Sequence, residues 1–234
     1  MAYQSHRDPL FDTKTQAVIE QRGREMLGLA VVVIGLILSI AILTYTPSDP
    51  SFLASSDEPV GNWLGGFGAA VAAPLMIIIG TAAWFLPLLF LVWGARLFLH
   101  QGSERAIGRL IFAPIAVAVA AIYAATTLPG EVWTHSFGLG GLFGDTVLIV
   151  ILQLVPGSAA AGARFISFIA GAGMVALGLF VLGFTRRELV RAVRYVVAGL
   201  ILTYDALMTM LGQGAQLGAR AATRRLAVED PHVS

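Results

Sequence analysis

The residues best suited to chemistry are few and scattered along the 234-residue chain. A phosphate-binding P-loop needs a Gly-Lys-Ser/Thr triplet whose lysine reaches the phosphates, but the single lysine, Lys14, follows a threonine. The four histidines, His6, His100, His135 and His232, have no metal-ligand partner at helical spacing. No spacing of serine, histidine and carboxylate indicates a catalytic triad. The sequence therefore predicts no catalysis and no bound cofactor or metal in this chain.

Composition indicates a different kind of protein. Hydrophobic residues make up 57% of the chain and charged residues only 12%, whereas an average soluble domain has about 25% charged residues. The exterior of a soluble fold must be largely polar, so this much apolar surface needs lipid as its solvent. The absence of cysteine excludes disulfides, iron–sulfur clusters and thiolate zinc sites. The predicted fold class is all-α, a polytopic transmembrane helical bundle.

Four uncharged apolar stretches are expected to cross the bilayer. They position the polar and charged residues, which lie in the segments between and beside them. The second is longer than the roughly 30 Å hydrocarbon core requires, so it should tilt or bend, with Pro74 and Pro87 as the expected bend points. The four predicted spans lie at about 27–45, 67–95, 110–128 and 165–184.

Two further apolar stretches are ambiguous. Residues 138–156 include Asp145 and are short for a span, so we expect a half-inserted, re-entrant or interfacial helix on the outer face. Residues 193–211 include Asp205, which shares one helical face with Arg187, Arg191, Arg194 and Ala198. This pattern favours a helix lying in the inner interface, and a fifth span is the alternative.

Basic residues set the expected topology, because Lys and Arg collect on the cytoplasmic side. All of them except Arg164 fall in three clusters that four spans would place inside, together with both termini. The predicted organisation is a leader (1–25), a transmembrane domain (26–185), a basic interfacial helix and tail (186–225) and the start of a linker (226–234). The clusters comprise Arg7, Lys14, Arg22 and Arg24; Arg96, Arg105 and Arg109; and Arg186, Arg187, Arg191, Arg194, Arg220, Arg224 and Arg225.

Small residues recur at helix-packing spacing, which lets helices approach closely in lipid. The first interpretation is packing within a four-helix bundle, and the alternative is that one of these faces is a subunit interface. The residues are Ala116, Ala120 and Ala124 in the third span, Gly140 and Gly144 in the outer segment, and Ala172 and Ala176 in the fourth span.

The loop after the first span carries an ordered set of turn residues. Its prolines and its Asp/Ser pair fix a tight exit from the helix, and its aromatic residues suit the headgroup level. A contact with another protein outside the membrane is the functional alternative. The set comprises Pro47, Ser48, Asp49, Pro50, Ser51 and Phe52, then Asn62 and Trp63, then Gly65 and Gly68.

This series, with the later glycine-rich run 138–144, resembles the N-terminal membrane domain of the FtsK/SpoIIIE family of DNA translocases. The resemblance extends from about residue 20 to 183 and has the same four-span plan. Many relatives have an acidic residue where this chain has Ala73, so a role of that carboxylate does not transfer. The motifs are turns and glycines, and their order and spacing carry the resemblance.

The resemblance implies a bacterial inner-membrane anchor that targets the division septum and forms oligomers, possibly hexamers in line with a hexameric motor. It also implies a motor, outside this chain, that uses ATP and Mg²⁺ to pump double-stranded DNA and couples chromosome segregation to cell division. The expected partners are a second copy of the chain, the lipid bilayer and division-site membrane proteins, with DNA bound only through the motor. The polar residues after Arg225 are expected to begin a linker, and a stand-alone paralogue is the other possibility.

Two other functions remain open at this stage. The chain could be a small structural subunit of another inner-membrane complex, which only the sequence beyond Ser234 would distinguish. A channel or transporter is the weakest candidate, because such proteins mark their pathway with ionisable residues inside their spans, and the predicted spans contain none.

Overall fold

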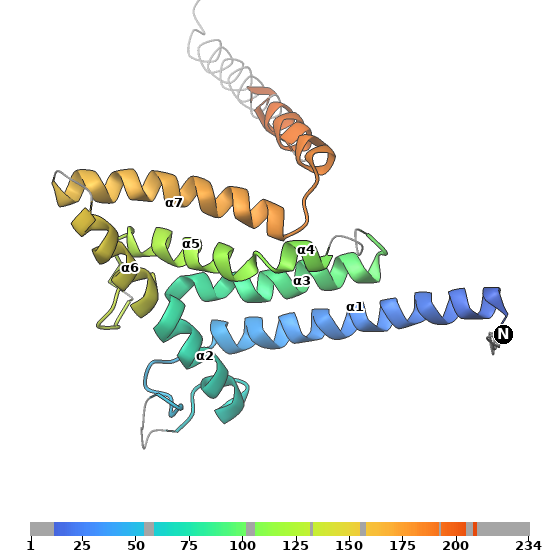
Figure 1. The fold of residues 1–234 in the computed structure, drawn as a ribbon, viewed down its shortest axis with the longest axis horizontal. Coiled ribbons are helices and arrows are strands. Elements are labelled where there is room, and N and C mark those ends of the chain that lie inside the picture. The colour runs from blue at the N-terminus through green and yellow to red at the C-terminus, as the bar shows by residue number, and fades with distance from the viewer. Residues whose placement is uncertain are drawn as a thin grey trace, which may run out of the picture. The chain divides into compact units, whose positions relative to one another are not determined.

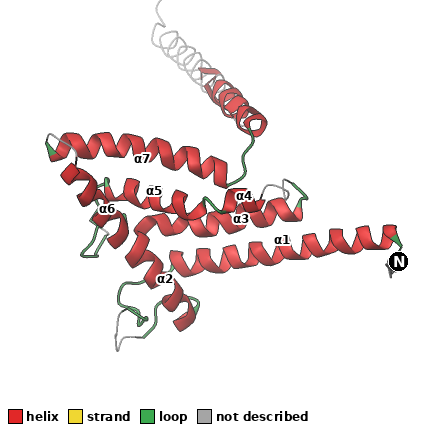
Figure 2. Cartoon of the chain, viewed as in Figure 1, coloured by secondary structure: helices red, strands yellow, loops and turns green. Residues whose placement is uncertain are grey.

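The computed structural model describes residues 12–53, 59–101, 106–131, 133–154, 158–191, 193–204 and 208–209, and these residues form helices joined by loops (Figure 2). They fall into two units, Met1–Gly183 and Phe184–Ser234. Four stretches of the described chain are long and apolar enough to cross a membrane, as the sequence predicts. The helices of the first unit are α1 (Thr13–Leu43), α2 (Gly65–Ile79), a 3₁₀ helix η1 (Gly80–Trp84), α3 (Phe85–Phe98), α4 (Ala106–Leu110), α5 (Ala113–Ala125), α6 (Gly141–Leu154) and α7 (Ala159–Val181).

The helices of the first unit have two orientations. In Figure 1, α1, α3, α5 and α7 run alongside one another, whereas α2 and α6 are inclined across the same end of them. The main contacts join α1 to α3 and α5 to α7, and α6 contacts both α2 and α5. We call the end that carries α2 and α6 the outer end, following the topology expected from the arginines.

The long second apolar stretch is two helices rather than one tilted span. Its direction changes at η1, where Gly80 has φ 58°. The expected bend is therefore present but lies at neither proline, because Pro74 is inside α2 and Pro87 is in the first turn of α3. Together η1 and α3 rise about 31 Å, close to the roughly 30 Å of a hydrocarbon core.

The break lies level with the outer end of α1. Ala83 of η1 packs against Ile42 at the end of α1 and against Met76 of α2. The amide and hydroxyl of Thr81 both donate to the carbonyl of Leu139, at 2.8 Å and 3.1 Å. Backbone groups freed by the break thus bond to the segment that leads into α6, which satisfies the need for internal hydrogen bonds in lipid.

Glycines bring α1 and α3 into backbone contact. A Cβ on Gly28 would lie 2.5 Å from the amide nitrogen of Phe98 and 2.8 Å from the carbonyl oxygen of Gly94. One on Gly35 would lie 2.9 Å from the side chain of Leu91. This antiparallel pair therefore depends on the missing side chains, since dispersion drives helix association in lipid.

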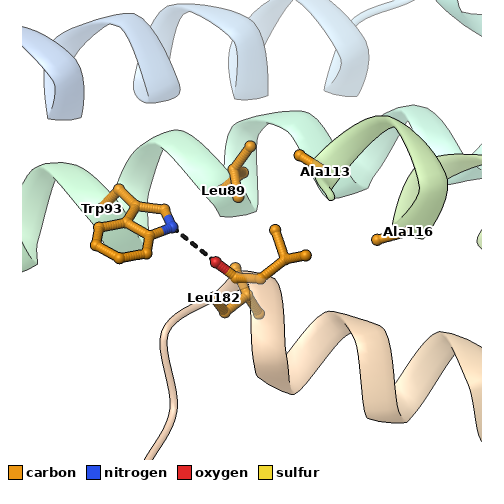
Figure 3. Close-up of a cluster of buried hydrophobic side chains, with 6 residues drawn as sticks. Leu89, Trp93, Ala113, Ala116 and Leu182 are labelled. Atoms are coloured by element: carbon orange, nitrogen blue, oxygen red, sulfur yellow. Dashed lines mark hydrogen bonds between the residues drawn. The ribbon is translucent and has the colours of Figure 1, made fainter. Parts of the chain in front are cut away.

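At the opposite, inner end, α7 is fixed to α3. The indole of Trp93 donates to the carbonyl of Val181 at 2.8 Å, beside Leu89, Ala113 and Leu182 (Figure 3). That carbonyl belongs to the last turn of α7, where no intrahelical donor remains. The opposite end of α7 begins at Ala159, earlier than predicted, because the Ser158 hydroxyl caps it by accepting from the amide of Ala161.

The second unit begins with a helical segment over 186–191 and 193–204. A capping box starts it: the amide of Thr185 donates to the Glu188 carboxylate at 2.9 Å, and the amide of Glu188 donates to the Thr185 hydroxyl at 3.3 Å. Asp205, which the sequence placed on the basic face, lies outside the described residues.

Candidate functional site

The outer loop is organised around one buried carboxylate. Asp49 is only 2% exposed, and its two oxygens accept hydrogen bonds from the amides of Gly61, at 2.7 Å, and Asn62, at 3.0 Å. A carboxylate that accepts from backbone amides makes strong, charge-assisted bonds. Asp49 therefore joins the turn after α1 to the entrance of α2, across the loop between them.

Asn62 extends this connection to the end of α1. It is 4% exposed, and its side-chain nitrogen, Nδ2, donates to the backbone carbonyls of Ala41, at 2.8 Å, and Thr44, at 3.3 Å. Its oxygen accepts from the amide of Leu64 at 3.1 Å. The last carbonyls of a helix lack intrahelical donors, so Asn62 acts as a distant cap on the first span.

Two glycines leave room for this arrangement. A Cβ on Gly68 would collide with the Asn62 side-chain oxygen, and one on Gly61 would lie 3.3 Å from an Asp49 oxygen. Gly65 has φ 63° and begins α2 in a left-handed conformation that favours glycine. Of the predicted motif residues, Asp49, Asn62 and Gly68 therefore form a buried centre, and the others form the turn around it.

The remaining motif residues lie on the surface of the loop. Phe52 is 86% exposed and Trp63 is 79% exposed, and their sequence neighbours Leu53 and Phe67 are exposed as well. Ser51 accepts from the amide of Leu53 at 3.3 Å. Pro47 and Ser48 are exposed and Pro50 is half-buried. The loop thus presents apolar side chains outward from a polar, hydrogen-bonded centre.

The outer end also contains an aromatic cluster that the sequence did not predict. The ring of His135 stacks on those of Tyr45 and Phe137, with centroid distances of 5.6 Å and 4.6 Å. The ring of Trp133 is tilted against it, with a centroid distance of 4.7 Å. The Trp133 indole donates to the carbonyl of Phe137 at 2.6 Å. This cluster joins the loop after α1 to the loop after α5. The aromatic residues at alternate positions 133, 135 and 137 were the available signal.

Burial affects the ionisable members of this cluster. Desolvation lowers the pKa of His135, which favours the neutral imidazole. Desolvation, with a smaller contribution from the charge of Asp49, raises the pKa of Tyr45. Neutral rings are therefore the form in which this cluster packs.

The glycine-rich outer segment packs against α5. A Cβ on Gly140 or on Gly144 would collide with the carbonyl of Ala121. On α5, Ala116, Ala120 and Ala124 are all buried within the unit. Asp145 closes the turn before α6, because its carboxylate accepts from the amide of Gly138 at 2.6 Å.

Ala172 and Ala176 have a different environment. Both are exposed on α7, whereas Ile166, Ala170 and Gly178 form its buried face. Of the predicted small-residue faces, the one on α7 is the one left open to lipid or to another chain.

The topology-setting arginines occupy separate places. In the first unit, Arg22 pairs with Glu25 and Arg24 with Glu20, each at 2.6 Å, within α1. Arg109 donates to the carbonyl of Phe180 at 3.4 Å and lies over its ring, while Arg96 is in the last turn of α3. Arg105 lies outside the described residues. In the second unit, Arg186, Arg187, Arg191 and Arg194 are exposed on the helical segment.

No group of three or more His, Asp or Glu side chains within the described ranges could hold a metal ion. The outer site is built from capping hydrogen bonds, stacked rings and exposed apolar side chains. Such a site can position a loop and present a surface.

Comparisons with known proteins agree with the motif. Residues 20–212 match the family model of the 4TM region of DNA translocase FtsK/SpoIIIE. Several relatives are described as DNA translocase FtsK. The one from Azospirillum brasilense is 31% identical over 92% of this chain and 33% of the relative. The one from Caulobacter vibrioides is 37% identical over 59% of this chain and 18% of the relative. The protein of Bradyrhizobium diazoefficiens is 32% identical over 56% of this chain and 16% of the relative. No solved structure matches.

The chain thus spans a third or less of the length of these relatives. Its match covers the four apolar helices and most of the segment after them. The resemblance expected from the outer loop is confirmed, and the chain belongs to the FtsK/SpoIIIE family of DNA translocases, of which it carries the membrane-embedded 4TM region.

Proposed function

We propose that this chain anchors a DNA-translocating motor in the bacterial inner membrane at the division septum and brings copies of the protein together. The observation that carries the proposal is the family match over residues 20–212, which coincides with the four apolar helices. The motor that uses ATP and moves DNA would belong to the rest of the full-length protein. The function of this chain is then to anchor that motor in the membrane, to place it at the septum and to bring its copies together.

The distribution of arginines supports a cytoplasmic motor. The inner ends of α1 and α3 and the start of the second unit carry Arg22, Arg24, Arg96 and Arg186, whereas the described residues of the outer loops carry no Lys or Arg. Under the positive-inside rule both ends of the chain lie in the cytoplasm. A motor joined after the fourth span would then reach chromosomal DNA.

The outer loop supports placement by a division-site membrane protein. Its buried Asp49 and Asn62 fix the backbone, and the fixed backbone presents Phe52 and Trp63 with little loss of conformational entropy on binding. Exposed aromatic residues on a rigid support are frequent anchors in protein interfaces. In this proposal the loop recognises its partner outside the membrane.

Placement can be tested with a fluorescent fusion in cells depleted of their own translocase. The unchanged chain should form a band at midcell, and Trp63→Ala should disperse over the membrane at an unchanged protein level. Phe168→Ala is the matched control, because Phe168 is 78% exposed but lies in α7, within the predicted fourth span and outside the loop. Retention of the midcell band by Trp63→Ala would contradict recognition through the loop.

Assembly can be tested through the open face of α7, since the chain has no cysteine of its own. Ala176→Cys should form a disulfide-linked dimer in oxidised native membranes. Val33→Cys, on an exposed face of α1, should remain monomeric. Equal cross-linking of both variants, or of neither, would contradict assembly through α7.

A further inference from the structure

The helical segment at the start of the second unit carries four arginines whose charges are not neutralised within the described chain. Arg186, Arg187, Arg191 and Arg194 line an open hollow of about 380 Å³, together with Val190. None of the four forms an ion pair with a described carboxylate. The only acid among the described residues of the segment, Glu188, takes part in the capping box.

This arrangement destabilises the helix unless an anion binds. Arg187, Arg191 and Arg194 follow one another at spacings of four and three residues, so like charges are neighbours on one face. Arg186 and Arg187 also lie in the first turn of the helix, where the helix dipole disfavours cations. A bound anion would remove both penalties.

The same helix has a second, apolar face. Leu189, Val193, Val196 and Leu200 recur at helical spacing, and their exposed fractions rise from 39% at Leu189 to 72% at Leu200. Arg187, Arg191 and Arg194 lie on a different face from these four residues, because successive residues are about 100° apart around a helix. Arg186 is in line with Val193 but stands at the first position of the helix, where its long side chain can reach the headgroups. The segment thus has a basic face and a hydrophobic face.

This combination distinguishes between anionic partners. Duplex DNA offers phosphates but no apolar surface for Val193, Val196 and Leu200. A bilayer interface offers anionic phosphates and hydrocarbon at adjacent depths, which is what such a helix requires. Only Leu182 to Thr185 separate Arg186 from the last residue of α7, so the arginines are juxtamembrane in the sequence.

We propose that Arg186, Arg187, Arg191 and Arg194 form a binding site for the phosphate headgroups of anionic phospholipids, with the apolar face of the same helix inserted beside the acyl chains. The guanidinium groups hold the phosphates, and the insertion of Val196 and Leu200 depends on the anionic lipid. The site is independent of the proposed placement at the septum, because it needs only a membrane of suitable charge.

The test uses the full chain in an uncharged detergent, with an environment-sensitive fluorophore on Val196→Cys. Phosphatidylglycerol should shift the emission to shorter wavelength, and phosphatidylcholine at the same concentration should not. In Arg187→Gln/Arg191→Gln the half-saturating concentration of phosphatidylglycerol should rise about 25-fold, from roughly fivefold per arginine. Arg187→Lys/Arg191→Lys should keep most of the response, because charge is retained.

Arg22→Gln/Arg24→Gln is the matched control, because it removes two arginines that α1 already pairs with Glu25 and Glu20. It should titrate like the unchanged chain, and no variant should have less helix by circular dichroism than the unchanged chain, because the glutamine substitutions relieve repulsion between like charges. The same titration with a double-stranded oligonucleotide tests whether the arginines bind DNA instead of lipid. The proposal is overturned if the oligonucleotide alone shifts the emission in an arginine-dependent way, if phosphatidylglycerol acts equally on the glutamine variant, or if neither ligand acts.

Discussion

Asp49 and Asn62 show how single residues can fix the outer loop. The Asp49 carboxylate accepts from two backbone amides while almost fully buried, and Asn62 caps α1. The sequence predicted a tight turn here, and the residues it singled out are at the centre of that turn. What it could not supply is the pairing of Asp49 with residue 62, because the carboxylate joins segments twelve and thirteen residues apart.

The first prediction concerns this carboxylate. Asp49→Asn replaces one accepting oxygen by an NH₂ group that faces a backbone amide, so a buried donor loses its partner. The free energy of unfolding should fall by about 2 kcal/mol, measured as a lower melting temperature in detergent by circular dichroism. Glu131→Gln, an exposed acid in the other outer loop, should melt like the unchanged chain. Equal melting of all three proteins would refute the capping role.

The second prediction concerns His135, whose ring stacks on Tyr45 and Phe137. Burial lowers the pKa of His135 in the folded protein below its ordinary value. The unfolded chain therefore binds the proton more readily, and stability is lost as the pH falls through the ordinary histidine value of about 6.5. The melting temperature should drop between pH 7 and pH 5, and His135→Phe should show a smaller drop. The same pH dependence in both proteins would exclude His135 as its source.

Among the elements, α1 and α3 depend most on glycine. Gly28→Ala would place a methyl group 2.5 Å from backbone atoms of α3, which cannot move aside as a side chain can. We expect a loss of about 1–3 kcal/mol from overpacking. Gly23→Ala, on the same helix with nothing within 4 Å, should gain up to about 1 kcal/mol from helix propensity. Thermal unfolding of the two variants should therefore shift in opposite directions, and shifts of the same sign would argue against the close contact.

The elements also show the limits of prediction from sequence. Hydrophobicity, charge and length were enough for four spans and a short outer helix, because lipid imposes those requirements on any chain. The break in the second apolar stretch was assigned to prolines, yet it lies at Gly80, where a positive φ and the carbonyl of Leu139 fix it. Leu139 lies 58 positions after Thr81, to which it is hydrogen-bonded, and a local sequence pattern cannot predict so distant a partner.

The faces of the helices were equally hard to predict. In water an apolar stripe marks the buried side of a helix, but in lipid both sides are apolar. Ala120 and Ala176 have the same local small-residue pattern, yet Ala120 is buried and Ala176 is exposed. Small-residue spacing therefore indicated contacts without saying which of them were made within the chain.

At the scale of the whole molecule, the first unit has unlike ends. The outer end carries the inclined helices α2 and α6, the capped loop and the aromatic cluster, while the inner end carries ion pairs and arginines. The function proposed above requires such an asymmetry, with a partner bound on one side of the membrane and a motor held on the other. The orientation follows from the positive-inside rule, so it can be tested directly.

The cysteine-free chain allows that test with single cysteines and a membrane-impermeant maleimide. Glu131→Cys, in the loop after α5, should react in intact cells. Gly23→Cys, near the start of α1, and Ala198→Cys, seven residues after Arg191 and thus on the basic face of the second unit's helical segment, should react only after the inner membrane is permeabilised. Gly23 precedes the first predicted span (27–45) and Ala198 follows the fourth (165–184), so the two positions must agree with each other if an even number of spans is crossed. Reaction of Ala198→Cys from outside, with Gly23→Cys protected, would make the segment after α7 an outer or spanning element, and a cytoplasmic motor could not be joined to it.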